Sequence, residues 1–142
     1  MSYKLVSYDL DEGFQMLVLG SVDQDGEAST FIGDLQSSGK TIDRASLISK
    51  SAKRIAMGGI EWAIVSRKLR KIDSDLALFE MKINKSVIRV MTYIHEEETP
   101  VYLFDFDGHQ GKTGKIPQSY IDKGREMAIH AAECMRSEEG ER

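Results

Sequence analysis

The stretch that decides the fold is residues 76–106, LALFEMKINKSVIRVMTYIHEEETPVYLFDF. It contains three runs, 76–84, 87–95 and 100–106, that are rich in β-branched and aromatic residues and separated by short polar segments. Links this short can join only antiparallel strands, because parallel strands need a long crossover. The stretch therefore predicts a three-stranded antiparallel meander.

The chain before the meander begins with strands and continues into helix. Residues 3–8 and 14–20 are short β-favouring runs, which predict either a strand pair or one strand preceded by a lead-in. Residues 23–26 predict a turn. Apolar residues at helical spacing then predict a short amphipathic helix over 27–37.

A longer helix should follow, beginning at Thr41 or Asp43, either of which can cap it, and ending at the two glycines 58 and 59. The two helices would form a hairpin. Residues 60–73 mix apolar and crowded basic side chains, and they predict a loop with some helix or strand.

The chain after the meander predicts a loop and a closing helix. Residues 108–115 are polar and rich in glycine, and Pro117 suits the first turn of a helix with an apolar side up to Met135. We expect the tail to fray from about residue 137. With 142 residues in all, the chain suits a single α+β domain spanning 1–142.

Composition argues against several classes of protein. Hydrophobic residues make up 41% and charged residues 30% of the chain, which is typical of a globular domain. No apolar run approaches the ~20 residues needed to cross a bilayer. Cys134 is the only cysteine, so a disulfide within the chain or a cysteine-based zinc site is excluded. We expect a cytoplasmic protein without membrane contact, metal or cofactor.

Charge is distributed unevenly along the chain. The net charge is −4, yet residues 50–93 carry 10 basic and 4 acidic residues. A basic stripe on an acidic protein indicates either a nucleic-acid contact surface or ordinary solvated helix and strand faces. Charge alone does not choose between them.

The order of predicted elements and three local motifs resemble the RelE/HigB-like toxins of type II toxin–antitoxin systems, in particular a phage-derived HigB-like subgroup. Residues 76–82, LALFEMK, look like the family's apolar pair followed by Glu-Leu-Arg, with Lys82 in place of the arginine. Residues 88–93, IRVMTY, are similar to the next strand with its arginine. Residues 104–106, FDF, and 112–117, KTGKIP, resemble the family's glycine-phenylalanine pair, lysine-rich loop and proline-initiated helix.

The resemblance implies a RelE-like fold and a ribosome-dependent endoribonuclease. Such toxins cut messenger RNA without a metal by driving the ribose 2′-hydroxyl onto the adjacent phosphate. The reaction needs a base, cations for the charge that builds on the phosphate, and an acid for the 5′-oxygen. The expected partners are the ribosome, messenger RNA and a cognate antitoxin that covers the cationic face and would provide any contact with DNA.

The meander supplies the first candidate residues. By the resemblance, Arg89 would bind phosphate, because its guanidinium can contact two oxygens and stays charged; alternatively it pairs with Glu80 across the hairpin. Lys82 would neutralise the transition state or be a solvated lysine. Strand alternation places Arg89, Tyr93 and His95 on one face. Tyr93 would stack on a base, act as a weak acid or simply pack on the sheet.

Loops supply the other candidates. His109 and Lys112 precede the closing helix, where the family often has basic residues, and a histidine suits proton transfer. We expect His95 to lie at a turn and His130 to have no chemical role. A further basic group would grip the RNA backbone, or would only solubilise a loop. Its members are Arg67, Lys68, Arg70, Lys71 and Lys115.

Two alternatives remain open. The chain could be a catalytically inactive RelE-fold module of prophage or regulatory origin that binds protein partners. It could also be an unrelated α+β protein whose meander matches by chance. A structure without a helix hairpin beside the sheet would favour the unrelated α+β protein.

Overall fold

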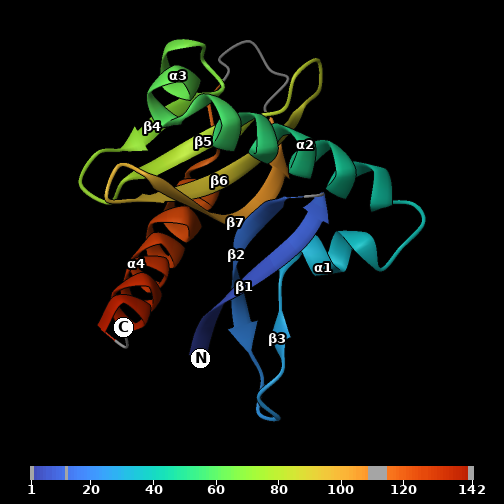
Figure 1. Cartoon of the computed structure of the whole chain (residues 1–142), viewed down its shortest axis with the longest axis vertical. Coiled ribbons are helices and arrows are strands. Elements are labelled where there is room, and N and C mark those ends of the chain that lie inside the picture. Colours follow the sequence, from blue (N-terminus) through green and yellow to red (C-terminus); the bar gives the residue numbers. More distant parts are fainter. Residues whose placement is uncertain (1, 12, 109–114, 141–142) are drawn as a thin grey trace.

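The computed structural model describes residues 2–11, 13–108 and 115–140 (Figure 1). It is an α+β fold in which helices cover both faces of one mixed sheet. The strand order is β1-β2-β7-β6-β5-β4, and β3 pairs with β2 outside this path. All neighbouring strands are antiparallel except β2 and β7, which are parallel.

The N-terminal segments form a strand pair, which is one of the two predicted alternatives. Strand β1 (Ser2–Asp11) pairs with β2 (Phe14–Val22). The predicted helix over 27–37 begins later than expected, because Ala28–Ser29 forms the short strand β3. Helix α1 (Phe31–Gln36) starts only after Thr30, whose side-chain oxygen accepts a hydrogen bond from the Gly33 N–H and caps it.

Two helices and a strand lie between α1 and the meander. Helix α2 (Ile42–Gly58) spans the predicted residues, and its C-cap is Gly59, which has a φ of 90° that only glycine adopts easily. Residues 60–73 were expected to form a loop with some helix or strand, and they contain both a helix and a strand. Helix α3 (Ile60–Val65) comes first, and strand β4 (Leu69–Asp73) follows it.

The meander is confirmed. It consists of β5 (Leu78–Lys82), β6 (Ile88–His95) and β7 (Thr99–Asp107). Alternation along β6 divides the core: Val90 packs with the helices α1 to α3, whereas Met91 packs with the C-terminal helix on the opposite face.

The closing helix α4 (Gln118–Gly140) is longer than predicted. Fraying was expected from about residue 137; the helix continues to Gly140, and Glu139 in its last turn is hydrogen-bonded to His95 of β6 at 2.7 Å. Of the helices that the structure describes, none is long and apolar enough to cross a membrane.

Candidate nucleic-acid interface

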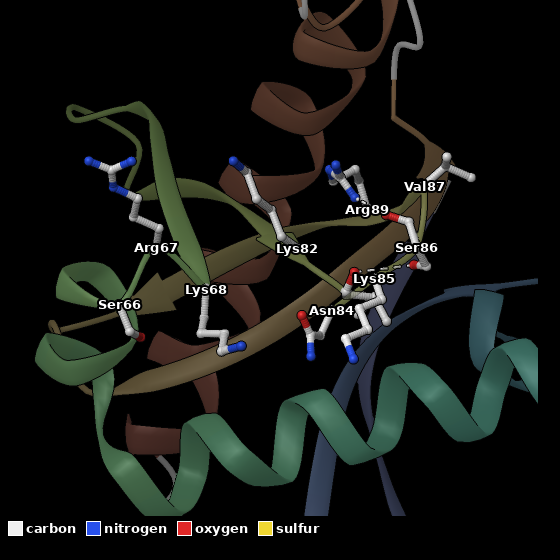
Figure 2. Close-up of a pocket in the computed structure, with 10 residues that line it drawn as sticks. Ser66, Arg67, Lys68, Lys82, Asn84, Lys85, Ser86, Val87 and Arg89 are labelled. Carbon is white, nitrogen blue, oxygen red and sulfur yellow. Dashed lines mark hydrogen bonds between the residues drawn. The ribbon is translucent and has the colours of Figure 1, made fainter.

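A cationic groove of about 560 Å³ lies between the α3–β4 connection and the β5–β6 turn (Figure 2). We call it the basic groove. No acidic residue is among the described residues that line it. Its basic lining residues are Arg67, Lys68, Lys82, Lys85 and Arg89.

Strand pairing brings two of these cations together. Lys82 of β5 is directly opposite Arg89 of β6, so both side chains leave the same face of the sheet, as Figure 2 shows. Like charges in this position destabilise a sheet. An anion bound between them would remove that repulsion, so the pair favours a groove that takes a negatively charged ligand.

The guanidinium of Arg89 is held by the backbone. Its Nη1 donates to the carbonyl oxygens of Ser86 at 3.0 Å and of Ile88 at 2.9 Å. Gly108 lies against it, and a Cβ at that position would come within 3.1 Å of the Arg89 Cζ. Within the described residues Arg89 has no carboxylate partner, so its charge remains available to a ligand.

The alternative pairing of Arg89 with Glu80 does not occur. The buried Glu80 carboxylate lies opposite Arg70 of β4 and pairs with its guanidinium at 3.3 Å. Register explains this choice: Lys82 takes the position opposite Arg89, and Glu80 sits two residues back along β5.

Two of the five cations sit on strained backbone. Arg67 has a φ of 63° and Lys85 a φ of 57°, both in the left-handed region. A residue with a side chain is disfavoured there by roughly 1–2 kcal/mol, whereas glycine is not. Strain of this kind clusters at functional sites. An arginine or a lysine in place of glycine at these positions therefore costs conformational free energy, which is consistent with a role for the groove.

The predicted basic run is divided between two surfaces. Arg67 and Lys68 line the basic groove, but Arg70 and Lys71 line a separate hollow together with Lys115. Arg70 is paired with Glu80, and the Lys71 ammonium lies 5.7 Å from the centre of the Phe79 ring. The five residues therefore do not form one continuous RNA-binding surface.

Tyr93 is apart from the basic groove. It does share a face with Arg89 and His95, but it lies four residues further along β6, which is about 13 Å. Its hydroxyl is 2.7 Å from His95 Nδ1, and burial raises the pKa of Tyr93. Packing on the sheet, one of the predicted alternatives, describes Tyr93 better than contact with a base.

One histidine also differs from expectation. His95 ends β6 as a buried residue instead of occupying a turn, because its ring is held between Tyr93 and Glu139. His130 stacks on the ring of Tyr3 with the ring centres 4.3 Å apart. The candidates His109 and Lys112 lie outside the described residues.

One cluster of described residues could hold a metal. The ligand atoms of His95, Glu96 and Glu139 lie within 4.8 Å of one another. His95 Nε2 and Glu139 are already hydrogen-bonded at 2.7 Å, so the pair has its polar atoms satisfied without an ion. The cluster is also remote from the basic groove, since none of its residues lines it.

The basic groove contains residues that the sequence did not single out. Lys85 and its neighbours Asn84 and Ser86 line it. In the sequence Lys85 and Ser86 were visible only as the polar link between two strands, and Asn84 only as the last residue of the first of these strands. Because a hairpin turn lies beside the strand ends, the lysine in that link was a usable signal.

Chemically, the groove offers positive charge and hydrogen-bond donors but, among the described residues, no histidine or carboxylate. Such an arrangement suits phosphate groups spaced along a nucleic-acid backbone. Comparisons of the chain with protein-family models, with curated proteins and with solved structures found no match.

Proposed function

We propose that the chain is the toxin of a type II toxin–antitoxin system, with a RelE-like fold and the activity of a ribosome-dependent messenger RNA endoribonuclease. The observation that carries the proposal is the Lys82–Arg89 pair, two like charges directly opposite each other in a groove that no acidic residue of the described chain lines. The motif resemblance in the same two strands selects RNA among the possible polyanions.

In the proposed reaction the ribose 2′-oxygen attacks the adjacent phosphorus and the bond to the 5′-oxygen breaks. The products are a 2′,3′-cyclic phosphate and a free 5′-hydroxyl. Arg89 would bind the non-bridging oxygens in a forked contact, and Lys82 would offset the charge that builds on them. Lys85 and Lys68 would hold the flanking phosphates.

Proton transfer is assigned to His109 and Lys112, on the resemblance alone. Tyr93 is removed from the catalytic set, because its hydroxyl is engaged by His95 and is distant from the groove. The proposed partners are the ribosome and messenger RNA in the cytoplasm, and an antitoxin whose acidic segment occupies the basic groove.

The test is induced expression in a bacterial host, with growth curves and mapping of messenger RNA 5′ ends. The unmutated chain should arrest growth and create new ends, and Arg89→Ala should do neither. Lys40→Ala is the matched control, because Lys40 is an exposed lysine of the α1–α2 connection that does not line the groove. Arrest by the Arg89→Ala variant at equal soluble level would refute the proposal.

A second candidate is a catalytically inactive binding module on the same fold. It is favoured by the lack of any histidine or carboxylate among the described residues of the basic groove. Normal growth and intact messages, combined with RNA binding by the purified chain, would select this candidate.

A further inference from the structure

A chemically different groove lies beside α3. It is formed by two adjoining hollows of about 600 and 460 Å³ that share Ile60, Glu61 and Glu97. Phe79 and Ile94 form a buried floor, and Ile64 and Val65 of α3 form a wall that is exposed, with Val65 at 77%. We call this the acidic-rimmed groove. An apolar hollow with an exposed apolar wall is typical of a binding surface.

The rim of this groove is acidic. Glu61, Glu96, Glu97 and Glu98 line it, and Lys71 is the one basic residue among the described lining residues. Within the described residues, none of the four carboxylates forms an ion pair with a lysine or arginine, and Glu96 lies 3.7 Å from the Nε2 atom of His95. The rim therefore carries a net negative charge, since four glutamates line the groove against one lysine.

The turn that holds part of this rim is strained. The Glu98 N–H donates to the His95 carbonyl at 3.0 Å, and both central residues, Glu96 and Glu97, have positive φ, at 52° and 63°. Asparagine and glycine are the usual residues at these positions. Two adjacent glutamates instead present two carboxylates at a conformational cost, which supports a role for their charge.

We propose that the acidic-rimmed groove binds an amphipathic helix of a partner protein, with apolar side chains on one face and lysines or arginines flanking them. We expect basic residues on the flanks because they complement the negative charge of the rim. We expect a helix, and not an extended segment, because Phe79 and Ile94 belong to β5 and β6, and each of these strands is paired with another strand on both sides. The floor thus offers side chains and no open backbone edge, so an extended segment would leave its own N–H and C=O groups unpaired.

This inference does not rest on the ribonuclease proposal, because the two grooves have no lining residue in common among the residues that the structure describes. Either can fail while the other holds.

The experiment measures binding of a labelled synthetic helical peptide to the purified full chain by fluorescence anisotropy. The probe carries leucines at i, i+3, i+4 and i+7 with flanking lysines, and a second peptide has glutamates in place of the lysines. We expect saturable binding of the lysine peptide only. The Glu61→Lys, Glu97→Lys double variant should weaken it at least about tenfold, since it places like charges against the probe.

Two further variants separate the groove from general charge. Val65→Ser should also weaken binding, and because Val65 is 77% exposed the change leaves the fold intact. Glu126→Lys, at an exposed position on α4 outside the groove, should leave the affinity unchanged. Absence of saturable binding of the lysine peptide, equal binding of both peptides, or an equal loss with Glu126→Lys would overturn the proposal.

Discussion

The basic groove makes a quantitative prediction about RNA binding and salt. If all five cations contact phosphates, the plot of log affinity against log salt concentration should have a slope of about −3.5, since each phosphate contributes about −0.7 on a single strand. Affinity should then fall roughly a hundredfold between 50 and 200 mM salt.

Arg89→Ala removes one of these contacts. It should lower affinity about tenfold or more, the value of one charge-assisted hydrogen-bonded contact, and should make the slope shallower by about 0.7. The assay is fluorescence anisotropy with a labelled single-stranded RNA at several potassium chloride concentrations. Lys40→Ala should leave both quantities unchanged. An Arg89→Ala variant with the parental slope, or an equal effect of Lys40→Ala, would refute the assignment of the groove.

Three other changes have defined outcomes. The hydrogen bond from Arg125 lowers the pKa of Asp73, so this contact stabilises the fold above the unfolded pKa of about 3.9 and is lost as pH falls through the lower folded value. Urea titrations should therefore show Asp73→Asn destabilised at pH 7, with the difference closing below about pH 4; a gap independent of pH would contradict this. Tyr93→Phe should lower the free energy of unfolding by about 1 kcal/mol by removing the bond to His95, without changing RNA affinity. Weaker RNA binding would return Tyr93 to the catalytic set. Glu97→Gly should raise the free energy of unfolding by about 0.5–1 kcal/mol, because glycine adopts the left-handed backbone freely. A lower free energy of unfolding would contradict the conclusion that the backbone at Glu97 is strained.

The sequence predicted the elements whose signals are local. The strands of the meander are rich in apolar residues and are separated by short polar links. Their existence and their antiparallel pairing could therefore be predicted directly. The pairing of β2 with β7 did not, because it joins Val18 to Tyr102 across most of the chain. The short strand β3 was taken as helix because Ala28 continues the helical spacing of Phe31 and Ile32, and only the cap at Thr30 marks the boundary.

For the site, the sequence predicted the cations better than their grouping. Lys82 and Arg89 were chosen from neighbouring strands, and the register then made them a direct pair. The division of the basic run was not predictable, since it depends on where β4 begins: Arg67 and Lys68 lie in the connection before the strand, whereas Arg70 and Lys71 lie within it. The burial of His95 depends on Glu139, 44 residues away, so no local pattern could indicate it.

The measurement that tests the central claim most directly is cleavage in vitro of a messenger RNA held on purified ribosomes, with analysis of the fragment ends. The account predicts fragments with 2′,3′-cyclic phosphate and 5′-hydroxyl ends that form in the presence of the unmutated chain and the Lys40→Ala variant but not with Arg89→Ala. An intact message in the presence of soluble, folded chain would contradict it, as would fragments that Arg89→Ala forms equally well.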